Sequence, residues 1–450
     1  MFQKILVANR GEIARRVVRT ARRLGVKTVA VHSDADAGAL FVRDADEAVR
    51  IGPPPPRESY LNVAAILAAA RDTGAQAIHP GYGFLSENAA FATEVARAGL
   101  VFIGPPPSAM NALGDKVEAK RNVSAVGVPV VPGFVGVLEN EDHAVAEANR
   151  IGFPVMLKAS AGGGGIGMHR CRSEADLRKN FGDARKKGEM FFGKSHVFLE
   201  KLIDRPRHVE VQIIGDAGGT VHALSERECS IQRRHQKVLE EAPSPVVDPP
   251  MRARMLEAAR KAGEAAGYRN AGTVEFIVDG NTREFFFLEV NARLQVEHPI
   301  TEAVMGIDLV EAQLRVAAGE PLPFDPAALR MDGHAIEARI CAEDPDKRFV
   351  PSPGTISALS FPSGEGIRVD TGVESGSVVT PYYDSLLAKL ICHGKDRAQA
   401  CDRLVAALRQ CKVEGIKTNI PLLEKVVDSE VFRSGKLHTD LLAESFGLKS

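Results

Sequence analysis

The start of the chain alternates between the hydrophobic periods of strands and helices. An apolar run at 4–8 has the length of a buried strand, and the segment NRG at 9–11 is typical of a turn. Apolar residues then recur at helical spacing as far as Leu24, with arginines on the opposite face. A second apolar strand follows at 27–34, and the alternation continues. This rhythm predicts a doubly wound α/β domain over residues 1–113.

Proline and glycine mark the later boundaries. After the Gly-Pro-Pro-Pro segment at 104–107, a helical linker is expected over residues 114–130. Residues 131–203 have the pattern of a smaller unit, in which a glycine-rich loop stands between two strands and a helix follows from about residue 174. The alternating and helical patterns of residues 204–450 predict a large mixed C-terminal domain. The fold class is therefore α/β to α+β.

Composition excludes several classes of protein. A chain of 450 residues with 44% hydrophobic composition can form several packed domains. Its net charge of −1 argues against a nucleic-acid partner. The 6 cysteines lack CxxC spacing, so neither a zinc site nor a disulfide scaffold is expected. No apolar run approaches the ~18 residues of a membrane span, and the start has no signal-peptide pattern. We therefore expect a cytoplasmic protein without a membrane partner.

The glycine-rich loop is the first candidate for chemistry. Gly163, Gly164 and Gly165 let backbone N–H groups approach phosphates closely, because no Cβ intervenes. The loop lacks the Lys-Ser/Thr ending of a Walker motif, so it resembles a flap over a nucleotide more than a P-loop. Lys158 and Lys116 add the two cations of a phosphate clamp. The alternative is a flexible hairpin tip.

Acidic residues inside apolar strands form the second candidate. Glu275 lies in GTVEFIV, and Glu289 and Asn291 are two residues apart in FFFLEVN, so they share one face of a strand. Oxygen ligands of this kind suit Mg²⁺. The alternative is a set of salt-bridged core acids.

Two further polar runs are weaker signals. The run 291–298 places Arg293, Gln295 and Glu297 at every second position, so a cation and a base could share one strand face. The run 230–237 is rich in cations. Either run could instead be solvated surface.

The motifs together resemble those of biotin carboxylases, which belong to the ATP-grasp superfamily. They occur in the family's order from residue 7 to residue 419: ANRGEIA, HPGYGFLSEN, GDK, KASAGGGG, RHVEVQ, SIQRRHQK, EVNARLQVEHPITE, AEDP, PSPG, PYYDS and EGIKTN. The resemblance implies an ATP-grasp fold in which residues 131–203 form a mobile lid. It also implies ATP and bicarbonate as substrates, Mg²⁺ or Mn²⁺ as the metal, and biotin as a carrier-bound substrate.

The resemblance also assigns site residues. It implies that the following residues bind ATP: Lys116, Lys158, the three glycines, Glu200, Lys201, His208, Gln232 and His235. Those implied to hold the metal are Glu275, Glu289 and Asn291. Those implied around bicarbonate are Lys237, Arg293, Gln295, Val296 and Glu297. Tyr82 and Arg339 would bind biotin, and the catalytic set would be Glu297, Arg339, Lys237 and Arg293.

The implied reaction is the first half-reaction of acetyl-CoA or another acyl-CoA carboxylase, in which biotin is carboxylated through carboxyphosphate. No Met-Lys-Met biotinylation motif occurs, so a separate biotin carboxyl carrier protein or domain is expected, together with a homodimer and a partner carboxyltransferase subunit. One departure is Ile166, where the family usually has Arg or Lys. The alternatives are another ATP-grasp ligase, the carboxylase subunit of a pyruvate or urea carboxylase, and an inactive ATP-binding subunit.

Overall fold

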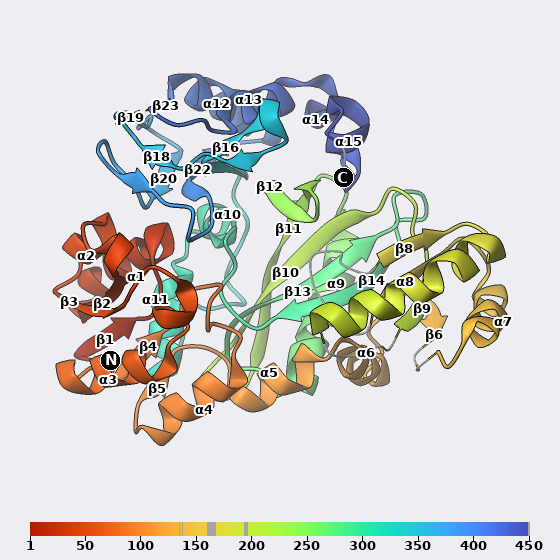
Figure 1. Ribbon diagram of the computed structural model, residues 1–450, viewed down its shortest axis with the longest axis horizontal. Coiled ribbons are helices and arrows are strands. Elements are labelled where there is room, and N and C mark those ends of the chain that lie inside the picture. Colours follow the sequence, from red (N-terminus) through yellow and green to blue (C-terminus); the bar gives the residue numbers. More distant parts are fainter. Residues whose placement is uncertain (135, 137, 160–167, 193–196, 449–450) are drawn as a thin grey trace.

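The computed structural model describes residues 1–134, 136, 138–159, 168–192 and 197–448. Figure 1 shows a red N-terminal unit, a yellow lid and a blue C-terminal region arranged around a long central sheet. Predicted site residues Gly163, Gly164 and Gly165, and the departure at Ile166, lie outside the described residues.

The N-terminal unit is built on a parallel five-stranded sheet in the order β3-β2-β1-β4-β5. Its strands are β1 (Lys4–Val7), β2 (Lys27–Ser33), β3 (Glu47–Gly52), β4 (Ala77–His79) and β5 (Val101–Phe102). Its helices are α1 (Gly11–Arg23), α2 (Leu40–Asp44), α3 (Val63–Thr73), α4 (Ala89–Arg97) and α5 (Pro107–Gly114). Helices α3 and α4 begin where Asn62 and Asn88 cap the first turn with their side chains. The predicted doubly wound α/β arrangement is confirmed.

Helix α6 (Lys116–Ala125) leads into the lid, a four-stranded sheet in the order β6-β9-β7-β8. The lid elements are β6 (Gly133–Phe134), α7 (Glu141–Ile151), β7 (Val155–Ala159), β8 (Met168–Cys171), α8 (Glu174–Phe192) and β9 (Val197–Lys201). Strands β7 and β8 are antiparallel neighbours, so the glycine-rich segment does join two strands as expected. Helix α8 starts at a cap in which the hydroxyl of Ser173 accepts the N–H of Asp176 at 3.2 Å.

The central sheet has eight strands in the order β14-β13-β10-β11-β12-β15-β22-β20. Its strands are β10 (Arg207–Gly215), β11 (Val221–Arg233), β12 (Gln236–Ala242), β13 (Asn270–Val278), β14 (Phe285–Asn291), β15 (His334–Cys341), β20 (Ile367–Thr371) and β22 (Leu386–Gly394). Every neighbouring pair is antiparallel. Helix α9 (Pro249–Ala265) buries Met251, Met255 and Ala259 in the apolar cluster that also contains Val211 and Val274 of the sheet.

The remaining elements close the ends of this sheet. Helices α10 (His298–Met305) and α11 (Leu309–Ala317) pack toward the N-terminal unit, whereas the last helices lie over β15 and β22 (Figure 1). Those last helices are α12 (Arg397–Gln410), α13 (Ile420–Asp428), α14 (Glu430–Arg433) and α15 (Leu441–Phe446). Three short ribbons pair β16 (Glu343–Asp344) with β17 (Val350–Pro351), β18 (Gly354–Thr355) with β21 (Val378–Val379), and β19 (Ala358–Ser360) with β23 (Lys412–Glu414).

Two expectations from composition can be compared with the structure. All six cysteines are free thiols. Within the described ranges, each helix is either too short or too polar to cross a lipid bilayer.

Candidate active site

A cavity of about 810 Å³ lies where the N-terminal unit, the lid and the central sheet meet. It is lined by every described residue that the sequence singled out. These are Tyr82, Lys116, Lys158, Glu200, Lys201, His208, Gln232, His235, Lys237, Glu275, Glu289, Asn291, Arg293, Gln295, Val296, Glu297 and Arg339. Residues from widely separated parts of the chain therefore face one space.

Lysines dominate the wall that the lid and α6 contribute. Lys116 forms an ion pair with Glu289 at 2.8 Å, and both Lys120 and Lys158 contact Glu200. Burial, reinforced by the charge of Lys116, lowers the pKa of Lys158 to about 8. An arriving polyphosphate would supply the negative charge that these ammonium groups need.

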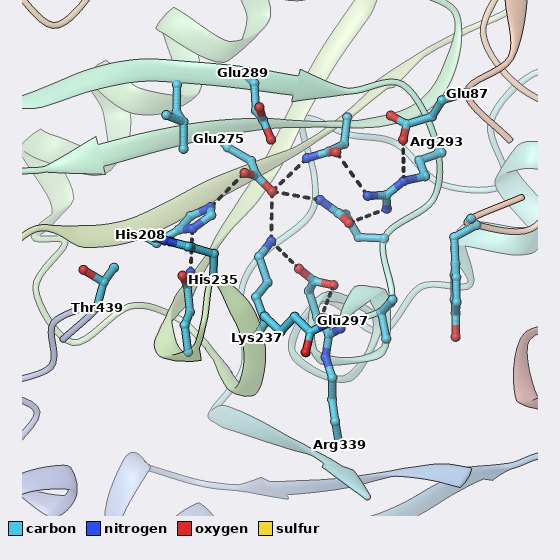
Figure 2. A pocket seen from close by; sticks show the side chains of 18 of the residues that line it. Glu87, His208, His235, Lys237, Glu275, Glu289, Arg293, Glu297, Arg339 and Thr439 are labelled. Carbon is cyan, nitrogen blue, oxygen red and sulfur yellow. Dashed lines mark hydrogen bonds and ion pairs between the residues drawn. The ribbon is translucent and has the colours of Figure 1, made fainter. Parts of the chain in front are cut away.

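The opposite wall, formed by the central sheet, is centred on Lys237. Its ammonium donates to Glu210 at 2.5 Å, to Glu275 at 2.9 Å and to Glu297 at 2.6 Å, and Figure 2 shows the last two contacts. Burial alone would lower the pKa of Lys237, but the three carboxylates outweigh burial and hold this pKa well above its usual value. Lys237 is therefore a fixed cation.

The three oxygen-bearing residues predicted to hold a metal lie side by side. Glu275 and Glu289 are directly opposite each other on β13 and β14, and the amide of Asn291 donates to Glu275 at 2.8 Å. His208, Glu210 and Glu275 also offer donor atoms that all lie within 4.8 Å of one another. Oxygen donors backed by one imidazole fit Mg²⁺ or Mn²⁺.

The run that carries Arg293, Gln295 and Glu297 is not a strand, so the expectation of one strand face was wrong. Strand β14 ends at Asn291, and residues 292–297 form a loop that leads into α10. Here the tertiary contacts override the alternating pattern: Arg293 reaches Glu87 at 3.0 Å and Gln295 at 2.5 Å, while Leu294 is buried in the core. All three polar side chains still reach the cavity.

Glu297 lines the cavity as a fully buried side chain, held between two cations. One oxygen accepts from Lys237, and the other accepts from Arg339 at 3.0 Å. Burial would raise the pKa of Glu297, but Lys237, Arg339 and Arg227 hold it well below its usual value. The carboxylate is thus ionised and can accept a proton from a ligand that displaces one of its partners.

Arg339 is itself anchored from behind by Glu240, which accepts from its Nε at 2.6 Å. Tyr82, the other residue expected at the biotin end, donates its hydroxyl proton to Glu12. Both residues line the same cavity.

Sequence profiles of known families match most of the chain. The profile of the biotin carboxylase N-terminal domain matches residues 1–110, and that of the biotin carboxylase C-terminal domain matches residues 337–444. Between them, residues 115–324 match the ATP-binding domain of the carbamoyl-phosphate synthase L chain. The biotin carboxylase of Halalkalibacterium halodurans is 51% identical over 450 residues, which cover 100% of this chain and 99% of that protein. The chain belongs to the biotin carboxylase family.

Other relatives of this biotin carboxylase family member belong to different carboxylases. A pyruvate carboxylase subunit from Methanothermobacter thermautotrophicus is 50% identical over 444 residues, which cover 99% of this chain and 90% of that protein. A crystal structure of the 2-oxoglutarate carboxylase biotin carboxylase domain dimer from Hydrogenobacter thermophilus has a TM-score of 0.94 and 46% identity, and covers 100% of this chain and 98% of that chain. That dimer holds MgADP, ADP and bicarbonate.

The family membership fixes the coarse function. This chain has the ATP-grasp fold and is an ATP-dependent ligase with the biotin carboxylase activity of a biotin-dependent carboxylase. The relatives do not agree on which carboxylase, because they include both biotin carboxylases and a pyruvate carboxylase subunit.

Of three further predicted residues, two are held by contacts and one is exposed. Gln232 lies 2.7 Å from Nδ1 of His208, His235 is exposed at the turn between β11 and β12, and Lys201 donates to the carbonyls of Gly152 at 2.8 Å and Phe153 at 3.1 Å. The ammonium of Lys201 therefore fixes the lid backbone rather than pointing freely into the cavity.

Sequence reasoning missed several lining or supporting residues. Lys120 lies one helical turn after Lys116, and Glu210 lies two strand positions after His208, so local periodicity could have found both. Glu12, Glu240 and Lys389 join the site only through tertiary contacts, and no local pattern points to them.

Proposed function

We propose that this chain is the biotin carboxylase subunit of an acyl-CoA carboxylase, carrying out the first half-reaction on biotin borne by a separate carrier protein. The observation that supports this best is Glu297, an ionised carboxylate that lines the cavity between Lys237 and Arg339. A base between two cations suits an anionic substrate that must lose a proton.

At the phosphate end, Lys116 and Lys158 would bind the phosphates of ATP, and the lid would close over them. Glu200, Lys201, His208, Gln232 and His235 would complete the nucleotide site, with the N–H groups of Gly163, Gly164 and Gly165 on the phosphates. The lysines of this wall outnumber the carboxylates that pair with them, so they favour a polyanion, and we expect them to bind the ATP phosphates strongly.

Glu275, Glu289 and Asn291 would hold Mg²⁺ or Mn²⁺. When bound, the metal would neutralise charge on the transferring phosphoryl group. The protein's own part is to release these oxygens from their present partners, namely Lys237 for Glu275 and Lys116 for Glu289.

Bicarbonate would lie among Lys237, Arg293, Gln295, Val296 and Glu297. Glu297 would take the bicarbonate proton, so that a bicarbonate oxygen attacks the γ-phosphorus of ATP and ADP leaves. The product, carboxyphosphate, would break down to CO₂ and phosphate, and that phosphate would remove the N1 proton of biotin. Arg339 would stabilise the biotin enolate, with Tyr82 beside the ring, and CO₂ would then add to N1.

The final acceptor and the assembly belong to the same proposal. We place the domain boundaries at 1–113, 114–130, 131–203 and 204–450, and we expect a homodimer with a biotin carboxyl carrier protein and a carboxyltransferase as partners. A pyruvate or urea carboxylase is the second candidate, because a pyruvate carboxylase subunit is among the close relatives.

Phosphate release from Mg-ATP tests the activity directly. The purified chain should release phosphate only with bicarbonate and faster with added free biotin. Release that depends on neither substrate would refute the proposed reaction. Mass spectrometry of the carrier and transferase that co-purify with the chain would then decide between an acyl-CoA and a pyruvate acceptor.

A further inference from the structure

Lys389 is a completely buried lysine in the middle of β22. Its side chain has 0% exposure. In the central sheet Lys389 lies directly opposite Arg339 on β15 and Asp370 on β20. Side chains at paired positions share one face of a sheet, so Lys389 is a close neighbour of the proposed biotin arginine. Burying an ammonium group is costly unless its protons are bound, and its partners are therefore informative.

The partners of Lys389 all line the catalytic cavity. Its ammonium donates to the backbone carbonyl of Val296 at 2.8 Å and pairs with Glu12 at 3.2 Å. It also lies 5.8 Å from the ring centroid of Tyr82, within the range of a cation–π contact. Because Tyr82 donates its hydroxyl proton to Glu12, one ammonium group connects the loop 292–297, helix α1 and the segment that carries Tyr82.

Two of the surrounding carboxyl groups, those of Glu12 and Glu337, are incompletely satisfied, whereas Asp370 is paired with Arg368. One oxygen of Glu12 and both oxygens of Glu337 are buried without a hydrogen-bond partner. Burial raises the pKa of Glu12 to about 7 and raises that of Glu337 well above its usual value. Lys389 contacts one oxygen of Glu12 and directs a further proton to the carbonyl of Val296, so it is placed to hold the loop as well as to balance charge.

We propose that Lys389 is a positioning residue, which holds the loop 292–297 and the Glu12–Tyr82 pair in register so that bicarbonate and biotin meet in one geometry. This inference rests on the proposed function, since it concerns the substrates of that site. Lys389 itself touches neither substrate in this account. It acts through the carbonyl of Val296 and through Glu12.

The central test is Lys389→Met, which keeps the length of the side chain but removes its charge and its donors. We expect the KM for bicarbonate and the KM for free biotin each to rise about tenfold. The dissociation constant of Mg-ATP, measured by calorimetry, should change less than about twofold, because Lys116 and Lys158 lie in the other wall. Lys389→Arg, which can still donate to Val296 and Glu12, should recover most of the loss. Lys395→Met, an exposed lysine just after the same strand, is the matched control.

A buried charge can be essential for folding, so Lys389→Met alone could fail to fold. A second variant therefore tests the same role without leaving an unpaired buried charge. Glu12→Gln combined with Lys389→Met removes both charges of the pair, and it should fold, with the two KM values raised as in the single variant. Unchanged KM values in a folded variant, or equal losses in Mg-ATP affinity and in both KM values, would overturn the positioning role. A wild-type chain without bicarbonate-dependent phosphate release would instead refute the proposed function, so the two failures are distinguishable.

Discussion

Both walls of the cavity pair lysines with carboxylates, but lysines are in excess in one wall and carboxylates in the other. In the wall formed by α6 and the lid, three lysines, Lys116, Lys120 and Lys158, share the carboxylates Glu200 and Glu289. In the wall formed by the central sheet, one lysine, Lys237, is shared by three carboxylates. Burial, together with the charge of Lys116, lowers the pKa of Lys158 to about 8. The carboxylates around Lys237 instead raise the pKa of that lysine, against the effect of its burial.

This contrast indicates how the site divides its work. The lysine-rich wall has fewer carboxylates than lysines until a polyphosphate arrives, so nucleotide binding and the ionisation of its lysines are coupled. The acid-rich wall is already paired within itself, so its charges are oriented before any substrate binds, as electrostatic catalysis requires. Changes in the first wall should therefore alter ATP affinity, and loss of the base Glu297 in the second wall should alter turnover.

The largest effect should come from Glu297 in the acid-rich wall. Glu297→Gln keeps the shape of the side chain but cannot accept the bicarbonate proton, so turnover should fall by roughly 10²-fold or more. Steady-state phosphate release should show the loss, while calorimetry should show nearly unchanged Mg-ATP binding. Glu257→Gln, on the exposed face of α9, is the matched control. Turnover within about twofold of wild type would mean that the base lies elsewhere.

The lysine-rich wall should show the opposite signature. Lys158→Met should raise the KM for ATP about tenfold, with a smaller change at saturating ATP, because a charge-assisted contact to phosphate is lost. The pH dependence gives a second check. Since the pKa of Lys158 is about 8, its charge is lost as the pH rises through 8, and ATP affinity should weaken between about pH 7 and pH 9.

Lys158→Arg is the control for that titration, because a guanidinium remains charged throughout this range. Its ATP affinity should be nearly independent of pH between about 7 and 9. Equal pH dependence in the wild type and in Lys158→Arg would assign the titration to another group.

Local sequence patterns predicted most of the named elements correctly, but not all of the site. The strand at 4–8, the helix after it and the strand pair around the glycine-rich segment follow from periodicity, and the structure has them within a few residues. Glu289 and Asn291 share one strand face, as alternation predicts. These features depend only on neighbours in the sequence.

The failures involve contacts between distant segments. Residues 292–297 alternate as a strand would, yet Leu294 is drawn into the core and Arg293 turns toward Glu87, so the segment becomes a loop. Lys389 and Glu12 meet only because β22 and α1 pack together, and neither stretch of sequence carries a sign of it. Tertiary packing decided both cases.

The smallest effect concerns the contact between the lid and the C-terminal region. Arg170 on β8 pairs with Asp440, just before α15, through two hydrogen bonds of 2.9 Å and 2.8 Å. The side chain of Arg170 is 50% exposed, and an exposed ion pair contributes typically ~0.2–1 kcal/mol, because water and salt screen it. Asp440 makes no side-chain cap to α15, so Asp440→Asn should affect the pair and leave the helix intact.

We expect the rate of ADP release from Asp440→Asn, followed by stopped flow, to rise by no more than about threefold, with the increase shrinking in higher salt. Glu444→Gln, which breaks the pair of α15 with Arg205 but does not reach β8, is the control and should leave release unchanged. A tenfold or salt-independent increase would show that this contact holds the lid closed. The affinity of the lysine-rich wall for the nucleotide would then depend on the position of the lid as well as on charge.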